Sequence, residues 1–185
     1  MKLLLIMLLF VISCSNTSQK INSNNQIELF NTSSEISIKD FKSHIGFLAS
    51  DELEGRASGT LGDEMAKDYI KKFFENASLP TKRSVKIQEH YVPAERKWNL
   101  KQEDMTVKTY NIIATLPGND PILKNEYVVI GGHYDGGAAT AAQLKKLGED
   151  KIYNNADDNA SGTATVLELF EKYASTNSNK RTLVF

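Results

Sequence analysis

The sequence contains few cysteines, histidines and prolines and has no excess of either charge. Its 185 residues include one cysteine, three histidines and four prolines, with 22 lysines and arginines against 23 aspartates and glutamates. A single cysteine excludes an internal disulfide. The net charge of −1 gives no reason to expect nucleic-acid binding, which favours a basic surface. A hydrophobic share of 41% argues against general disorder, and the length predicts one domain.

The amino terminus has no apolar run long enough to span a bilayer, which needs about 20 residues. Residues 3–12 are apolar and lie between Lys2 and Ser13, which is typical of a secretory signal peptide over residues 1–14. The stretch VISC ending at Cys14 resembles the lipobox of bacterial lipoproteins. This resemblance implies lipidation of Cys14 and a membrane-anchored location in the bacterial cell envelope, facing the periplasm or the surface. The alternative is an ordinary signal peptide in which Cys14 has no role.

The rest of the chain divides into a tether and one domain. Residues 15–35 begin with a polar stretch and are expected to form a flexible tether, followed by a domain over residues 36–185. Apolar residues recur every three or four positions in three segments, near residues 38–49, 65–74 and 163–173, which predicts helices. Strands are predicted at residues 85–91, 110–116, 127–130 and 181–185, the third covered on both faces. Intermingled helices and strands predict an α/β domain.

Two of the three histidines have no obvious ligand partner. His44 sits beside the apolar stripe of the first predicted helix, and His90 lies in the first predicted strand. We interpret His44 as a packing or surface residue and His90 as a surface residue. Similarly, the charged stretch 51–60 (DELEGRASGT) could touch a substrate, but solvated turn chemistry explains it equally well.

The third histidine lies in the strand-end motif, residues 130–137 (IGGHYDGG). Ligand sites of open α/β sheets normally lie at the carboxyl ends of strands. Side chains two apart on a strand share a face, so His133 and Asp135 should point the same way. A metal-bound imidazole usually donates its other N–H to a carboxylate or carbonyl, and Asp135 could be that partner. By itself, however, a His-x-Asp sequence is weak evidence for a metal.

The acidic motif, residues 154–162 (NNADDNASG), precedes the third predicted helix. Asn159 or Ser161 could cap that helix without any catalytic role. Capping does not explain the adjacent Asp157 and Asp158, although acids before a helix gain slightly from its dipole. A carboxylate can bridge two zinc ions held about 3.5–4 Å apart, with a histidine completing one end.

Together, the two motifs resemble the co-catalytic zinc aminopeptidase family, which includes bacterial secreted aminopeptidases, plasma glutamate carboxypeptidase and glutaminyl cyclases. Residues 44–56 (HIGFLASDELEGR), 111–118 (NIIATLPG) and the KRTLVF ending also fit it. The resemblance implies a three-layer α-β-α fold with a mixed, mostly parallel sheet that is truncated at the carboxyl terminus. It implies that His133 binds zinc, Asp135 orients that histidine and Asp158 bridges two zincs. Asp157 would be a neighbour, and the Asp158–Asn159 peptide would be cis.

The function implied is hydrolysis of a peptide substrate at its free amino terminus by a water that two zinc ions activate. In the family, the glutamate that acts as general base and the remaining ligands follow the KRTLVF-like strand, beyond Phe185. The chain alone is therefore expected to be inactive. Two alternatives remain open: a cyclase-like relative with a single zinc, and a lipid-anchored binding domain without metal.

Overall fold

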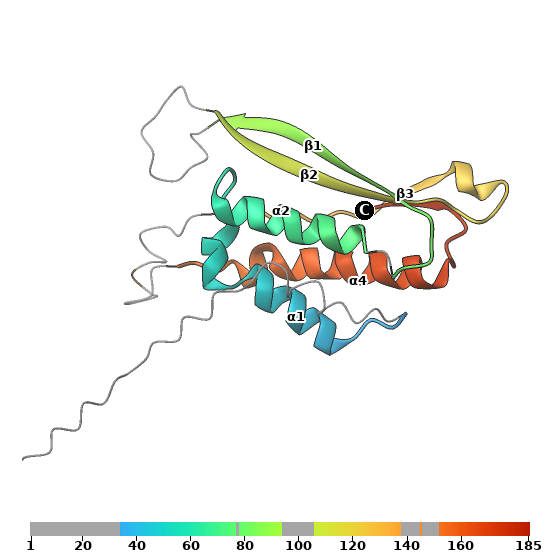
Figure 1. The fold of residues 1–185 in the computed structure, drawn as a ribbon, viewed down its shortest axis with the longest axis horizontal. Coiled ribbons are helices and arrows are strands. Elements are labelled where there is room, and N and C mark those ends of the chain that lie inside the picture. Colours follow the sequence, from blue (N-terminus) through green and yellow to red (C-terminus); the bar gives the residue numbers. More distant parts are fainter. Residues whose placement is uncertain (1–33, 77, 94–105, 138–144, 146–151) are drawn as a thin grey trace, which may run out of the picture. The chain divides into compact units, whose positions relative to one another are not determined.

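Three α-helices form in the segments where apolar periodicity predicted helices. A computed structural model of the chain describes residues 34–76, 78–93, 106–137, 145 and 152–185, shown in colour in Figure 1. The helices are α1 (Ile38–Leu48), α2 (Leu61–Phe74) and α4 (Ser161–Thr176), close to the predicted ranges. The signal peptide, Cys14 and the tether up to residue 33 lie outside the described residues. None of the described helices is both long enough and apolar enough for a membrane span.

Side-chain caps fix the starts of the first two helices. The Ser37 hydroxyl accepts a hydrogen bond from the Asp40 amide at 3.1 Å, and the Thr60 hydroxyl accepts one from the Asp63 amide at 3.3 Å. Such caps satisfy backbone donors that have no partner within the helix. The short helix η2 (Asp51–Arg56) lies between α1 and α2.

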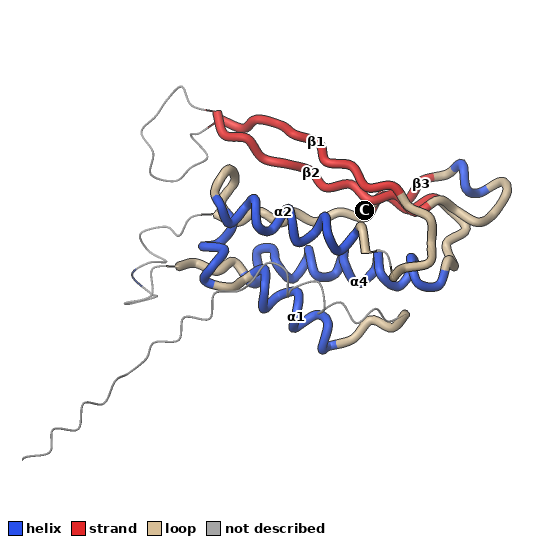
Figure 2. The backbone as a smooth tube through the Cα atoms, viewed as in Figure 1, coloured by secondary structure: helices blue, strands red, loops and turns tan. Residues whose placement is uncertain are grey.

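The described strands form one mixed sheet, as predicted, but most of their pairings are antiparallel rather than parallel. The strands are β1 (Ser84–Pro93), β2 (Thr106–Leu116), β3 (Tyr127–Val129) and β4 (Thr182–Val184), in the order β1-β2-β4-β3 (Figure 2). β1 and β4 both pair antiparallel with β2, and only β3 and β4 pair in parallel. The long β1–β2 ribbon therefore dominates this part of the sheet.

Aromatic contacts join the helices to the sheet. The Phe170 ring of α4 lies 4.6 Å from the Phe74 ring of α2 and 5.5 Å from the Phe185 ring that follows β4. α2 also packs against β2, while α1 packs against α4. These helices are drawn on the same side of the sheet (Figure 1), so the described residues supply one of the two helical layers that were predicted.

β3 differs from the prediction of a strand covered on both faces. All three of its residues are exposed, Val129 at 75%. The reason is its place at the edge of the sheet, where β4 is its only neighbour among the described strands. The continuous apolar run predicted the strand correctly, but it did not show whether other residues cover the strand.

The buried face of α1 is also shifted from the predicted stripe. Ile38 is 78% exposed, whereas His44 is only 3% exposed and lies among residues of three helices. His44 Nδ1 is 2.7 Å from the Tyr69 hydroxyl, and Nε2 is 3.4 Å from Glu168 Oε1. Packing is thus the role of His44, and its burial lowers its pKa to about 4 despite the opposing effect of Asp40.

This burial predicts an acid-sensitive contribution to stability. The folded protein holds His44 neutral, whereas the unfolded chain takes up a proton near pH 6.5. Between pH 6.5 and 4, the protein should therefore lose up to roughly 3 kcal/mol of unfolding free energy relative to His44→Phe, which does not titrate. Denaturant unfolding across this range measures the difference, with both proteins also carrying Glu168→Gln, because the Glu168 carboxylate beside His44 would otherwise titrate differently in the two. A difference that does not change with pH would contradict the lowered pKa.

Candidate metal centre

The strand-end motif leaves the sheet directly after β3. The Ile130 amide still donates to the Val184 carbonyl at 2.8 Å, and residues 131–135 then continue without regular structure. His133 Nδ1 lies 3.0 Å from the Asp135 carbonyl oxygen and 3.2 Å from the carboxylate oxygen Oδ1. The other carboxylate oxygen of Asp135 accepts a hydrogen bond from the Ser58 hydroxyl at 2.9 Å. His133 and Asp135 are therefore together, as predicted, with Nε2 of the imidazole left available.

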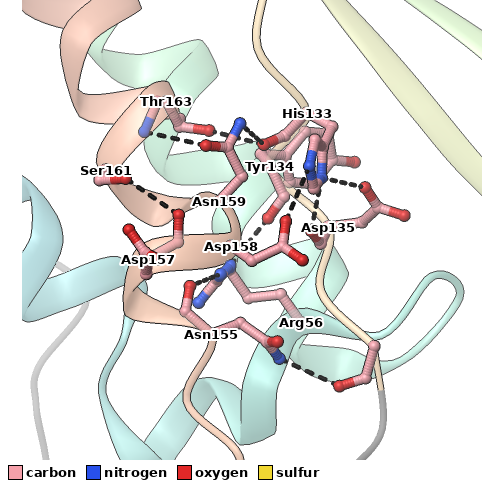
Figure 3. Close-up of polar contacts among 12 residues, drawn as sticks. Arg56, His133, Tyr134, Asp135, Asn155, Asp157, Asp158, Asn159, Ser161 and Thr163 are labelled. Atoms are coloured by element: carbon pink, nitrogen blue, oxygen red, sulfur yellow. Dashed lines mark hydrogen bonds and ion pairs between the residues drawn. The ribbon is translucent and has the colours of Figure 1, made fainter.

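The acidic motif brings Asp158 to that free nitrogen. Asp158 Oδ1 lies 3.2 Å from His133 Nε2, although the two residues are far apart in sequence (Figure 3). The turn η5 (Ala156–Ala160) carries Asp158, and the Asp158–Asn159 peptide is cis, as the family resemblance implied. The Asp157 carboxylate lies away from His133 in Figure 3, so only one acid of the pair reaches the imidazole.

The first turn of α4 fixes the backbone of His133. The His133 carbonyl accepts hydrogen bonds from the Thr163 hydroxyl at 3.0 Å and from the Asn159 side-chain amide at 3.2 Å. Asn159 Oδ1 in turn accepts from the Gly162 amide, in the first turn of α4, at 3.1 Å, although the N-cap residue is Ala160 and neither Asn159 nor Ser161. One asparagine thus ties His133 to the start of the helix.

The ligand atoms fit zinc coordination. Zinc bonds to histidine nitrogen at about 2.0–2.1 Å and to carboxylate oxygen at about 2.0–2.2 Å, so two tetrahedral ligands lie about 3.3 Å apart. The 3.2 Å separation of His133 Nε2 and Asp158 Oδ1 matches this value. The contact of Nδ1 with Asp135 is also the support that a metal-bound imidazole usually has. His133 and Asp158 could therefore hold one ion between them.

The other two histidines do not join this pair. His44 packs between helices, and His90 lies half-buried on β1 opposite Thr109. Among residues 34–76, 78–93, 106–137, 145 and 152–185, no group of three or more histidine, cysteine, aspartate or glutamate side chains could hold a metal. A structural zinc site has four protein ligands and a catalytic one three. The described residues could thus supply only part of a coordination sphere.

Arg56 is the important residue that the sequence analysis missed. The charged stretch 51–60 suggested solvated turn chemistry, but Arg56 is fully buried. Its Nε donates to the Tyr134 carbonyl at 2.7 Å, and its two terminal nitrogens donate to the carbonyls of Leu48, Asn154 (3.0 Å) and Asn155 (2.9 Å). Burial lowers the pKa of Arg56, and the Asp135 carboxylate opposes that change. Composition and periodicity give no signal for this role.

Asn155 makes a second connection between the motifs. It adopts a left-handed backbone conformation (φ 52°), and its side-chain amide donates to the carbonyls of Gly55, Gly137 and Tyr153 at 2.8–3.2 Å. The Gly136 amide donates to the Arg56 carbonyl at 3.0 Å. η2 and the strand-end motif therefore meet backbone to backbone, and the Asn155 side chain joins both of them to the acidic motif.

Tyr134 anchors the strand-end motif in the protein interior. It is buried, whereas the side chains of its neighbours His133 and Asp135 are about half exposed. Burial and then the neighbouring Asp63 carboxylate raise the pKa of Tyr134, so its hydroxyl stays protonated at neutral pH. Asp63 is itself fully buried, accepts from the Gly59 amide at 2.7 Å, and has its pKa raised by burial.

The backbone contacts make Gly136 a sensitive position. A Cβ at Gly136 would lie 2.1 Å from the Gly55 carbonyl oxygen and 2.6 Å from the Asn155 side chain, but at Gly137 it would meet nothing within 4 Å. Gly136→Ala should therefore lower the unfolding free energy by about 1–3 kcal/mol. Gly137→Ala should change it by less than about 0.5 kcal/mol. Thermal unfolding compares the two variants, and equal losses would contradict the tight contact.

Part of the chain matches a known protein family. Residues 111–185, which include both motifs, match peptidase family M28. None of the curated proteins compared with the chain matches it.

Solved structures share the fold. Fimbriiglobus ruber glutaminyl cyclase matches with a TM-score of 0.61 and 20% identity, covering 84% of this chain and 45% of its own. Tannerella forsythia glutaminyl cyclase matches with a TM-score of 0.59 and 17% identity, and the match covers 80% of this chain and 46% of the cyclase. A leucine aminopeptidase precursor from Bacteroides thetaiotaomicron VPI-5482 matches with a TM-score of 0.56 and 14% identity, and the match covers 84% of this chain and 48% of the precursor. The chain thus spans about half the length of these structures. Residues 111–185 therefore match peptidase family M28 in sequence, and the described part of the chain shares the α/β fold of these solved structures.

Proposed function

We propose that the protein is a zinc-dependent metallopeptidase that removes residues from the free amino terminus of peptides. The observation that carries this proposal is the 3.2 Å separation of His133 Nε2 and Asp158 Oδ1, within the segment that matches the family. A hydrogen bond between an imidazole and a carboxylate has a similar length, so the pair supports zinc binding together with the Asp135 contact at His133 Nδ1 and the family match of this segment.

Three side chains would have distinct roles in the proposed site. His133 and Asp158 would bind zinc, and Asp135 would hold the imidazole through Nδ1. The Asp158 side chain is 79% exposed, so its second carboxylate oxygen could reach a second ion. When bound, two zinc ions would lower the pKa of a water molecule and polarise the scissile carbonyl. The general base and the remaining ligands would come from outside these described residues.

The surroundings of the pair are suited to an organic substrate. A cavity of about 1100 Å³ borders both His133 and Asp158, and most of its wall is apolar. Its apolar residues come from β2, α2 and α4 as well as from the strand-end motif, among them Ile112, Phe74 and Leu167. Such a space could receive part of a peptide substrate next to the metal.

A second candidate function is glutaminyl cyclisation with a single zinc. Two of the similar structures, from Fimbriiglobus ruber and Tannerella forsythia, are glutaminyl cyclases. The two functions differ in zinc content and in product. A peptidase would hold two zinc ions and release an amino acid, whereas a cyclase would hold one and release ammonia from an amino-terminal glutamine.

The adjacent acids allow a matched test of the zinc site. In the protein expressed from its own gene, Asp158→Asn should weaken zinc binding by more than about 100-fold, because losses at supporting residues alone reach 10–100-fold. Asp157→Asn removes the same charge one position away and should leave most of the affinity. Competition with a zinc-chelating dye measures both, and zinc content distinguishes one ion from two. Equal effects of the two substitutions, or no bound zinc in the unsubstituted protein, would contradict the proposal.

We further propose that lipidated Cys14 anchors the protein to a membrane of the bacterial cell envelope. The support is the apolar run 3–12 and the VISC stretch that ends at Cys14. Several acyl chains on one residue hold a protein on a bilayer stably, whereas a single chain is marginal. The tether predicted over residues 15–35 would then separate the domain from the membrane surface.

This anchor can be removed by one substitution. Cys14→Ser should move the protein from the membrane fraction to the soluble fraction and abolish labelling by a radioactive fatty acid, because the thiol that carries the lipid is lost. Ser15→Ala, one residue away, should change neither. Membrane association of Cys14→Ser without label would instead indicate an uncleaved signal peptide.

A further inference from the structure

Arg56 occupies a position that its chemistry alone does not explain. It is a fully buried cation, and its hydrogen bonds go to backbone carbonyls rather than to a carboxylate. It also has a positive φ of 62°, which a residue other than glycine rarely adopts. Burying a charge is costly unless hydrogen bonds compensate for the lost water. The role of Arg56 therefore depends on which carbonyls accept its hydrogen bonds.

The four carbonyls belong to different parts of the site. Leu48 ends α1, Tyr134 lies between His133 and Asp135, and Asn154 and Asn155 begin the acidic motif. A planar guanidinium has five N–H donors at fixed angles, so it can hold several carbonyls in one arrangement. Of the residues that Arg56 binds, Tyr134 is one position from His133, and Asn155 is three positions from Asp158.

From this geometry we propose that Arg56 is a positioning residue that holds His133 and Asp158 at metal-binding distance by joining the strand-end motif to the acidic motif. This inference rests on the proposed zinc function for its effect on binding. It extends that function to a residue that touches neither the metal ligands' side chains nor the space between them.

The sign of the change in zinc affinity tests this inference. A buried positive charge near a zinc site repels the dication, so removing the charge alone should strengthen zinc binding. Removing the connection between the motifs should weaken zinc binding, because the two ligand atoms lose their fixed separation. The direction of the change therefore distinguishes a positioning role from a purely electrostatic one.

Arg83 provides a matched control within the same chain. It also donates to four backbone carbonyls, those of Phe74, Leu79, Thr81 and Asn76, and burial lowers its pKa as well. These carbonyls lie around the end of α2 and the loop before β1, outside both motifs. Removing Arg83 should therefore cost stability in the same way without disturbing the zinc ligands.

The experiment compares Arg56→Met, Arg56→Lys and Arg83→Met with the unsubstituted protein, all expressed from the native gene. Zinc affinity is measured by dye competition on the folded fraction, and folding is monitored by thermal unfolding. Arg56→Met should weaken zinc binding by about 10–100-fold, the range seen when supporting residues are lost. Arg56→Lys keeps the charge but lacks the guanidinium fork, so it should also weaken binding. This variant decides the question if the methionine variant does not fold.

Hydrogen exchange provides a second measurement that needs no metal. The Gly136 amide is bonded to the Arg56 carbonyl, and the Ala160 amide to the Asn155 carbonyl, so each reports on one motif. In zinc-free protein, both amides should exchange faster in Arg56→Met but not in Arg83→Met. If the unsubstituted protein binds no zinc, the proposed function fails, and this measurement alone decides the positioning role.

Two results would overturn the inference. One is zinc binding in the Arg56 variants that equals or exceeds that of the unsubstituted protein. The other is exchange at Gly136 and Ala160 that is unchanged, or that rises equally when Arg83 is replaced. Either would mean that Arg56 contributes only to general stability or only through its charge.

Discussion

The site depends on hydrogen bonds between one buried guanidinium and the backbone of segments distant in sequence. Arg56 reaches carbonyls of α1, the strand-end motif and the acidic motif at once. Its hydrogen bonds are made to carbonyls rather than to variable side chains, so they fix the path of the backbone itself. The exposed pair of proposed ligands, His133 and Asp158, is then held by this interior contact and not by its own mutual attraction, which solvent weakens.

The remaining support of the site divides between its two sides. On one side, Asp135 and Ser58 fix the orientation of the His133 ring. On the other, Asn159 and Thr163 hold its carbonyl at the start of α4. His133, the proposed zinc ligand, is thus restrained both at its ring and at its backbone, which is the arrangement that accurate metal coordination requires.

Sequence patterns predicted the elements and the proximity of His133 to Asp158, but not the contacts that join the segments carrying them. Periodicity located α1, α2 and α4 because burial of one helix face imposes a repeat on the sequence. His133 and Asp158 were predicted because their residue types and local sequences match a known chemistry. Arg56 was missed because burial of a charge depends on distant carbonyls, which leave no pattern around it. The exposure of β3 was missed for a similar reason, because the same apolar run is expected for a strand at the centre of a sheet and for one at its edge.

The side-chain amide of Asn155 binds the carbonyls of Gly137 and Tyr153 together, and these residues flank the stretch 138–152. The two ends of that stretch are therefore fastened to each other independently of what lies between them. Lengthening or shortening the chain between these two ends adds little entropic cost, because the cost of closing a loop grows only slowly with its length. A change in the number of residues within 138–152 should consequently leave the separation of His133 Nε2 and Asp158 Oδ1 unaltered.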